Sequence, residues 1–284
     1  MAAPPVGNIS DTARWVAMYR ALESERPDAL FRDPFARDLA GEHGLRILDA
    51  MPAGRQSAWA FVVRTLVMDE LILRCVAQGA DTIVNLAAGL DARPYRMELP
   101  ATMRWIDVDL PGILDYKETV LGAAKPVCRL ERVRLDLSDT AARRELFARI
   151  GASSKRVATV TEGLLVYLTR EQAGALASDL HANGAFRWWI IDIASPDLMR
   201  WMQKRYQKPL SAAGAPLRFA PEEGTGFYRP FGWNTVEFRS SLGEARKVRR
   251  APGWSWIVDL IGLLSRERRE RMYRMGGIAL LERA

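Results

Sequence analysis

Short runs of apolar residues alternate with amphipathic stretches through the middle of this 284-residue chain. Each run is typical of a buried strand, and five are expected at residues 82–86, 104–108, 132–135, 157–161 and 188–193. Between them, apolar residues recur at three- and four-residue intervals, which predicts helices over residues 111–121, 140–150 and 170–182. Alternating strands and helices are typical of a parallel sheet with helices on both faces, so we expect an α/β fold.

Amphipathic patterns also precede the first strand, where helices are predicted from about residue 11, over 34–39 and over 58–77. Residues 1–8 show no such pattern and are expected to be disordered. The domain organisation that we expect therefore begins with a helical N-terminal extension, residues 1–80. The core of the sheet follows in residues 81–194.

The regular alternation stops after the fifth strand. Residues 195–233 contain five prolines and several aromatic residues without a clear period, which indicates an insertion. At the ligand edge of the sheet, such an insertion would act as a substrate lid. Late strands at 235–238 and 277–281, with a helix over 265–275 between them, are expected to complete the core as residues 234–284.

Composition agrees with a globular protein, since 49% of the residues are apolar and 26% are charged. No apolar run approaches the ~20 residues of a membrane span, because the strongest one, residues 254–264, is interrupted by Asp259. The N-terminus lacks a signal-peptide pattern. Two cysteines, Cys75 and Cys128, are too few for a disulfide framework or a zinc site. We therefore expect a cytoplasmic protein without a membrane or metal partner.

The net charge of +7 is compatible with an acidic partner such as RNA. The arginines, however, are distributed along the chain and often alternate with acidic residues. The one dense run, residues 266–271, is typical of the solvated face of a helix. A nucleic-acid partner is therefore not expected, and the pattern does not indicate an oligomeric state.

The strongest functional pattern lies in residues 82–109. The turn Ala87-Ala88-Gly89 follows the first strand, and Asp109 ends the second strand, 20 positions after Gly89. This spacing is typical of a turn that approaches a nucleotide and a carboxylate that binds its ribose. The turn has one glycine, so the three-glycine pattern that holds a pyrophosphate is absent. Taken alone, this pattern does not distinguish a dinucleotide from another ligand that contains adenosine.

Acidic residues recur at the ends of the predicted strands. They are Asp91, Asp109, Asp136 and Glu162, with Asp192 inside the fifth strand. Because the carboxyl ends of parallel strands meet at one edge of a sheet, we expect these side chains around one ligand site. For any one of them the alternative is to cap the following helix. For Asp109 we favour ribose binding.

Several blocks of the sequence resemble the leucine carboxyl methyltransferase superfamily, in particular the bacterial branch with polyketide O-methyltransferases of the tetracenomycin type. The blocks are residues 10–13, 20–23, 31–35, 64–65 with Asp69, 87–93, 107–111 and 161–169. The resemblance implies a Rossmann-like class I methyltransferase sheet and S-adenosyl-L-methionine as cofactor. It also implies methyl transfer to a hydroxyl or carboxyl group, for which we favour a small molecule such as a polyketide-like or other secondary metabolite.

The resemblance assigns five residues to the methionine end of that cofactor. Arg64 would pair with the cofactor's carboxylate, which a planar guanidinium binds through two parallel hydrogen bonds. Ala88 and Gly89 would let the backbone approach the cofactor, and Asp91 would brace the turn. Glu162 would lie beside the cofactor's amino group or at the mouth of the substrate site.

The adenosine end would be held by Asp109 at the ribose hydroxyls and by Asp136 and Leu137 at the adenine. Two residues depart from the family pattern. Ala87 stands where the family commonly has glycine, which is costly if φ is positive there. Asp107 stands where the family commonly has glutamate, and this shortening by one methylene is mild.

Methyl transfer from a sulfonium depends mostly on positioning, and a base helps only with a hydroxyl acceptor. His43 and His181 are not expected to be that base. The acceptor-side candidates are Glu162, Tyr167, Asp192 and Tyr228.

Three other functions stay open on the sequence. A protein C-terminal carboxylate is the alternative acceptor. A nicotinamide-dependent oxidoreductase shares the sheet and the ribose acid but needs a pyrophosphate site. A non-catalytic RNA-binding module is compatible with the basic charge, and it would show steep salt dependence.

Overall fold

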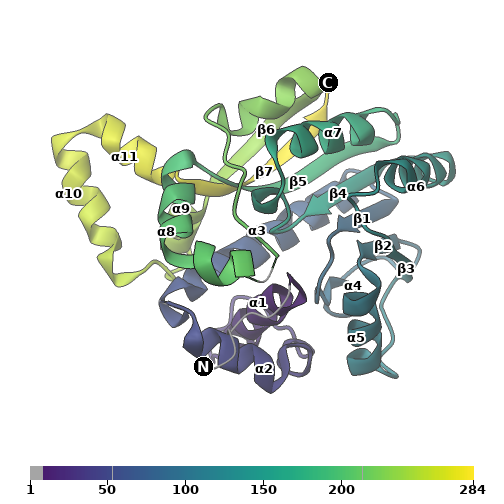
Figure 1. The fold of residues 1–284 in the computed structure, drawn as a ribbon, viewed down its shortest axis with the longest axis horizontal. Helices are drawn as coiled ribbons and strands as arrows, with labels where there is room; N and C mark the ends of the chain where they lie inside the picture. Colours follow the sequence, from purple (N-terminus) through teal and green to yellow (C-terminus); the bar gives the residue numbers. More distant parts are fainter. Residues whose placement is uncertain (1–8, 53, 213) are drawn as a thin grey trace.

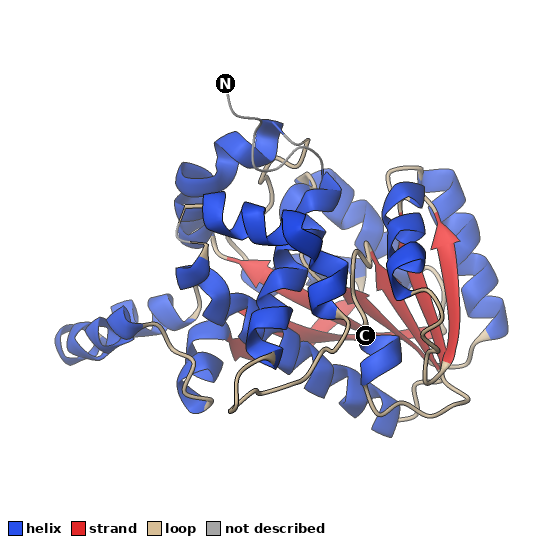
Figure 2. Cartoon of the chain, turned by 90° about the horizontal axis from the view of Figure 1, so that it is seen from below, coloured by secondary structure: helices blue, strands red, loops and turns tan. Residues whose placement is uncertain are grey.

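The computed structural model describes residues 9–52, 54–212 and 214–284, which form a central sheet with helices on both faces (Figures 1 and 2). The α/β fold expected from the alternating pattern is confirmed. The expectation of disorder for residues 1–8 lies outside the described residues.

The sheet has seven strands in the order β3-β2-β1-β4-β5-β7-β6. The strands are β1 (Thr82–Leu86), β2 (Arg104–Asp109), β3 (Arg129–Arg134), β4 (Val157–Thr161), β5 (Phe186–Ala194), β6 (Trp233–Ser240) and β7 (Gly276–Arg283). Strands β1 to β5 are parallel, whereas β7 is antiparallel to both of its neighbours. The chain builds outward from β1 in one direction and from β4 in the other. The strand order therefore reverses between β1 and β4, where open α/β sheets bind ligands.

The central strands match the predicted ranges because every residue in β1 and β4 is buried. Strands covered on both faces are continuous apolar runs, which is the strongest pattern a sequence shows for a strand. Strand β3 lies at the edge and begins at Arg129, three residues earlier than predicted. Its exposed and half-buried arginine and glutamate side chains conceal that start.

Eleven α-helices occur in the described residues. They are α1 (Ile9–Ser24), α2 (Ala36–Ala50), α3 (Ala58–Ala77), α4 (Arg93–Arg96), α5 (Pro111–Leu121), α6 (Thr140–Ser153), α7 (Arg170–His181), α8 (Pro196–Ala212), α9 (Ser241–Lys247), α10 (Trp256–Leu264) and α11 (Arg266–Tyr273). Helix α3 packs on the sheet, with Val63 and Ile72 in one core with Ile190 of β5 and Ile278 of β7. Helices α1 and α2 pack together in a second core. None of these helices is long and apolar enough to cross a bilayer.

Residues 195–233 are more regular than their prolines suggest. Helix α8 runs through Pro209, and a 3-10 helix covers Gly224–Phe231. Tyr206 and Leu210 of α8 share a buried core with Trp15 of α1. Part of the segment therefore packs against the N-terminal helices, and its role as a substrate lid stays a prediction.

Candidate functional site

A cavity of about 230 Å³ opens at the carboxyl ends of β1, β2, β4 and β5. The strand ends contribute polar walls, and helices α1, α3 and α8 contribute mainly apolar ones. The apolar residues that these helices contribute include Trp15, Val16, Phe61, Met202 and Leu210, with Tyr206 beside them. Because this is where the strand order reverses, the cavity is the candidate ligand site.

The turn after β1 forms one wall, and two of its residues have positive φ. Gly89 has a φ of +49°, and a Cβ there would lie 3.2 Å from the Cβ of Ala13 on α1. Glycine is therefore required at 89 for both conformation and space. Ala87 has a φ of +54°. A positive φ is costly for alanine because of its Cβ, so the turn is strained at the position where the family pattern has glycine.

Asp109 fastens this turn to the end of β2. Its two carboxylate oxygens accept hydrogen bonds from the backbone N–H of Gly89 at 2.6 Å and of Leu110 at 2.7 Å. Burial raises the pKa of Asp109, against the effect of the two amides. An ionised carboxylate has about four acceptor positions, so each oxygen can accept a further hydrogen bond from a ligand in the cavity.

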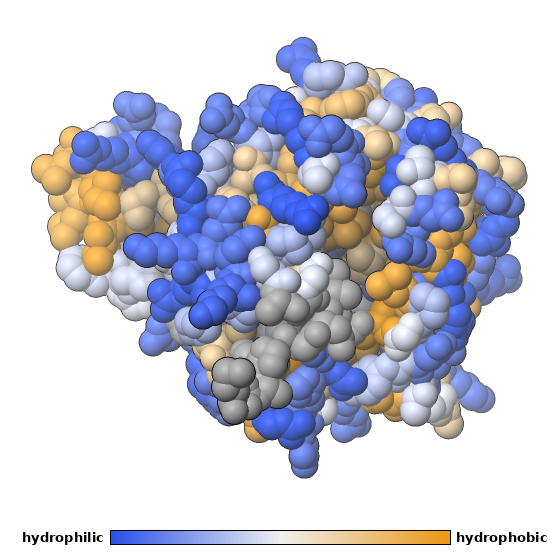
Figure 3. All heavy atoms as spheres, in the orientation of Figure 1, coloured by the Kyte–Doolittle hydropathy of each residue, from blue (hydrophilic) through white to orange (hydrophobic). Residues whose placement is uncertain are grey.

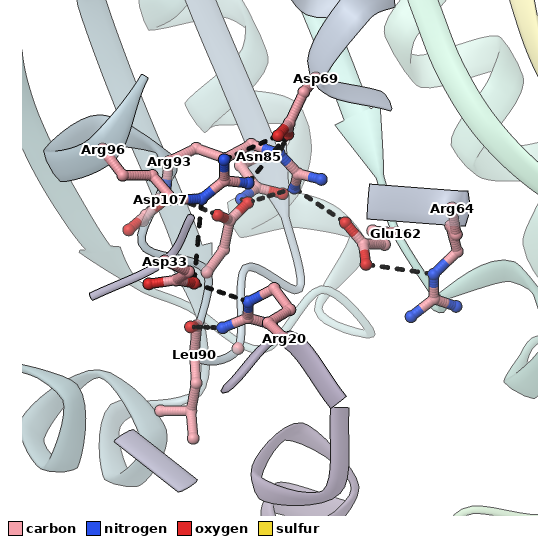
Figure 4. Close-up of polar contacts among 12 residues, drawn as sticks. Arg20, Asp33, Arg64, Asp69, Asn85, Leu90, Arg93, Arg96, Asp107 and Glu162 are labelled. Atoms are coloured by element: carbon pink, nitrogen blue, oxygen red, sulfur yellow. Dashed lines mark hydrogen bonds and ion pairs between the residues drawn. The ribbon is translucent and has the colours of Figure 1, made fainter. Parts of the chain in front are cut away.

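A buried guanidinium lies behind the polar wall (Figure 4). Arg93 is 2% exposed and donates to Asp69 at 2.6 Å, to Asp91 at 2.6 Å and to Glu162 at 2.8 Å. Although burial raises the pKa of Asp91, Arg93 and other cations hold it well below its usual range. Asp91 is therefore ionised and forms part of the frame of the turn.

Arg64 reaches the cavity from α3. Its Nε donates to Glu162 at 3.1 Å and its Nη1 donates to Asp192 at 2.9 Å. A Cβ at Gly163 would lie 3.2 Å from Nη1 of Arg64, so the glycine leaves room for this guanidinium. The Gly163 N–H also donates to Asp192 at 2.8 Å. Arg64 is thus oriented by two carboxylates, while its Nη2 makes no hydrogen bond to a described residue.

Glu162 lies between two guanidiniums, one oxygen paired with Arg64 and the other with Arg93. Burial raises the pKa of Glu162, but Arg93 and Arg64 outweigh it and lower the pKa below its usual value. A carboxylate stabilised in this way is a weak base. The geometry supports the expected binding role of Glu162 more than the expected catalytic one.

The two candidate tyrosines lie in different places. Tyr167 lines the cavity, and burial raises the pKa of its hydroxyl. Tyr228 is fully buried between Trp189 and Phe227, with ring centroids 5.0 Å away on each side. Its hydroxyl has no hydrogen-bond partner among the described residues, and Tyr228 does not line the cavity. The structure therefore does not bring Tyr228 to a substrate, because its ring belongs to the core.

The expected adenine contacts lie just beyond β3. Asp136 is exposed and accepts a hydrogen bond from the Ser138 N–H at 2.8 Å, and Leu137 is half-buried. Neither residue lines the cavity. Adenine binding by Asp136 and Leu137 stays a prediction.

Three polar residues at the site had no predicted role. Arg20 lines the cavity and donates to Asp33 at 2.8 Å and to the carbonyl of Leu90 at 2.5 Å. Asn85 lines the cavity beside Asp91. Arg93 does not line the cavity but donates hydrogen bonds to Asp91 and Glu162, which do. Arg20 and Arg93 both lie inside blocks that carried the family resemblance, and that was the available signal.

The charged lining is acidic although the chain is basic. Four carboxylates line the cavity, those of Asp91, Asp109, Glu162 and Asp192, against the two guanidiniums of Arg20 and Arg64. Such a wall favours a ligand with positive charge over an anionic one. In the described residues no group of three or more His, Cys, Asp or Glu side chains is placed to hold a metal ion.

Comparisons with known proteins agree with these observations. The model of the leucine carboxyl methyltransferase family matches residues 13–181. A relative from Frankia alni, named as an S-adenosyl-L-methionine-dependent methyltransferase, is 36% identical in an alignment of 266 residues, with 85% of this chain and 89% of the relative covered. Relatives from Streptomyces coelicolor and Parafrankia sp., named likewise, are 36% and 37% identical over 61% of this chain. Those alignments span 65% and 58% of the relatives' own lengths.

Two solved structures share the fold at low sequence identity. A DUF574 family protein from Streptomyces avermitilis has a TM-score of 0.59 and 14% identity, with 96% of this chain and 97% of that chain covered. A protein from Thermobifida fusca, described as a methyltransferase, has a TM-score of 0.59 and 13% identity, with 98% and 96% covered. The expected Rossmann-like methyltransferase sheet is thus confirmed.

Proposed function

The chain belongs to the leucine carboxyl methyltransferase family, and on that premise we propose that it is an S-adenosyl-L-methionine-dependent O-methyltransferase. Its acceptor is the hydroxyl or carboxyl group of a small molecule, such as a polyketide-like or other secondary metabolite. The observation that carries this proposal is the acidic cavity wall with one oriented guanidinium at the point where the strand order reverses.

The residues present fit the cofactor at both ends. The free acceptor positions of Asp109 suit two neighbouring ribose hydroxyls. At the other end, Nη2 of Arg64 is left for a carboxylate, and Glu162 and Asp192 beside it suit an ammonium group. The cofactor carries a positive sulfonium, an ammonium and one carboxylate, so its net charge complements four carboxylates and two guanidiniums. The two negative phosphates of a dinucleotide would face repulsion there.

When bound, the cofactor supplies a methyl group on a sulfonium, which is already activated toward displacement. The chain's own contribution is to position the acceptor, and positioning contributes up to about 7–11 kcal/mol in favourable geometry. Trp15, Phe61 and Met202 form an apolar wall that excludes water and suits an apolar acceptor. Tyr167 keeps its proton at neutral pH, so its hydroxyl can hold an acceptor oxygen by a hydrogen bond.

The apolar wall is the reason to prefer a small molecule over the alternative acceptor, a protein C-terminal carboxylate. A cytoplasmic location is part of the proposal, since Cys75 and Cys128 are both free thiols, as in a reducing compartment.

Ligand binding tests the proposal directly. We expect S-adenosylhomocysteine, but not NAD, to raise the melting temperature of the protein. Asp109→Asn removes the charge that would hold the ribose, so it should weaken S-adenosylhomocysteine binding about 10- to 100-fold in calorimetry. Asp38→Asn, at an exposed position on α2, is the matched control and should bind normally. A melting shift with NAD alone would contradict the proposal.

A further inference from the structure

Helices α10 and α11, with the turn before them, form an arm of residues 253–275 that projects from the body of the molecule (Figures 1 and 2). Its apolar side chains are unusually exposed, with Trp256 57%, Leu263 83% and Leu264 90% accessible. Elsewhere in the described residues, the most exposed large apolar side chain is Val236, at 48%. Figure 3 shows the arm as an apolar patch set among polar side chains. Patches of this kind mark sites of interaction.

The bend between the two helices places the leucines at the tip of the arm. Helix α10 ends at Leu264, and Ser265 begins α11 by accepting a hydrogen bond from the Arg268 N–H at 3.3 Å. A Cβ at Gly262 would lie 2.7 Å from Cδ of Arg269, so the stem of this arginine packs across α10. Cationic side chains therefore lie directly beside the exposed leucines.

The arm itself carries a net positive charge. Residues 253–275 contain five basic and three acidic residues, a net charge of +2. Arg268 and Arg274 are exposed and form no ion pair with any described residue. The dense run of residues 266–271, expected from the sequence to be the solvated face of a helix, lies on this arm as α11.

We propose that the arm docks the protein onto an anionic lipid surface. The tryptophan and leucine side chains enter the boundary between headgroups and acyl chains, and the neighbouring arginines contact lipid phosphates. Short apolar helices with tryptophan and flanking arginine are suited to lie in that boundary. The sequence pattern predicts no membrane partner because no apolar run is long enough to span a bilayer, whereas a helix that lies on the membrane surface needs no such run.

A lipid surface accounts for both the exposed apolar side chains and the neighbouring arginines of the arm. A second copy of the chain would bring two arms of like charge, +2 each, together, which is repulsive. A nucleic acid would pair with the arginines but would leave Leu263 and Leu264 in water. The proposal does not depend on the methyltransferase activity.

Vesicle flotation with the full chain tests the proposal. We expect it to float with vesicles of phosphatidylcholine and phosphatidylglycerol, weakly with phosphatidylcholine alone, and less at high salt. The double variant Leu263→Gln, Leu264→Gln should lower the partition coefficient at least about tenfold. The double variant Arg268→Gln, Arg274→Gln should lower it by about tenfold on the anionic vesicles.

Two matched controls should bind normally. Val236→Gln, at an exposed position on β6, is the control for the leucine changes. Arg46→Gln, at an exposed position on α2, is the control for the arginine changes. Absence of flotation would overturn the proposal, as would flotation that the two leucine changes leave intact. Dimerisation that the leucine changes abolish, in a protein that does not float, would assign the patch to a second copy and also overturn it.

Discussion

Ala87 combines a special backbone conformation with a residue that does not favour it. Its φ of +54° places the Cβ against the backbone, a conformation that glycine adopts without this cost. We expect Ala87→Gly to raise the free energy of unfolding by roughly 0.5–1 kcal/mol, measured by urea denaturation. At Ala88, where φ is not positive, the same change should lower it by a similar amount. Equal losses at both positions would show that Ala87 is not strained.

Individual residues of the site were predictable where they adjoin a strand. Asp109, Gly89 and Arg64 all line the cavity. Gly89 and Asp109 could be predicted because the turn after β1 and the end of β2 are recognisable in the sequence. Tyr228 could not be judged from its spacing, since its burial depends on contacts with Trp189 and Phe227.

At the scale of elements, one guanidinium joins three segments that are far apart in the chain. Arg93 binds Asp69 of α3, Asp91 after β1 and Glu162 after β4. No spacing rule links these positions, so the network could not be derived from the sequence.

Removal of this guanidinium leaves three carboxylates near one another with fewer cations. We expect Arg93→Met to lower the free energy of unfolding by about 3–5 kcal/mol, because a broken buried ion pair leaves uncompensated charge. The control is Arg144→Met, whose side chain is 65% exposed although it also pairs with a carboxylate, that of Asp179. It should cost no more than about 1 kcal/mol. Similar losses in chemical denaturation would contradict the importance of the Arg93 network.

Whole elements were predicted well where burial is complete and poorly at the periphery. The ranges of β1, β4, α3 and α5 coincide with the apolar pattern. Helix α8 contains Pro209, and α10 is apolar on nearly every side, so neither shows the alternation that predicts a surface helix. The sequence pattern predicts an irregular segment in place of α8, and it shows α10 only as an apolar run too short to span a membrane.

At the scale of the whole molecule, buried carboxylates make stability depend on pH. Burial raises the pKa values of Asp91 and Glu162, but Arg93 and other cations lower them below their usual range. A carboxyl group whose folded pKa is depressed stabilises the fold above its unfolded pKa, about 4, and loses that contribution as pH falls through the folded pKa. Asp109, with a raised pKa, acts in the opposite direction but is a single group.

We therefore expect the free energy of unfolding to fall progressively below about pH 4, measured by urea denaturation across a pH series. Glu162→Gln removes one of the two titrating groups, so its decline with acid should be shallower than that of the native chain. A variant that declines as steeply as the native chain would show that Glu162 does not contribute.

The antiparallel strands at the sheet edge explain how the arm is attached. Ser240 at the end of β6 pairs with Gly277 of β7, so the chain leaves the sheet and returns to it at neighbouring points. The excursion through α9, α10 and α11 can lengthen, shrink or be exchanged without changing the order of the strands. The family model ends at residue 181, well before this excursion. In evolutionary terms, this excursion can change in length or composition among relatives while the sheet keeps its strand order.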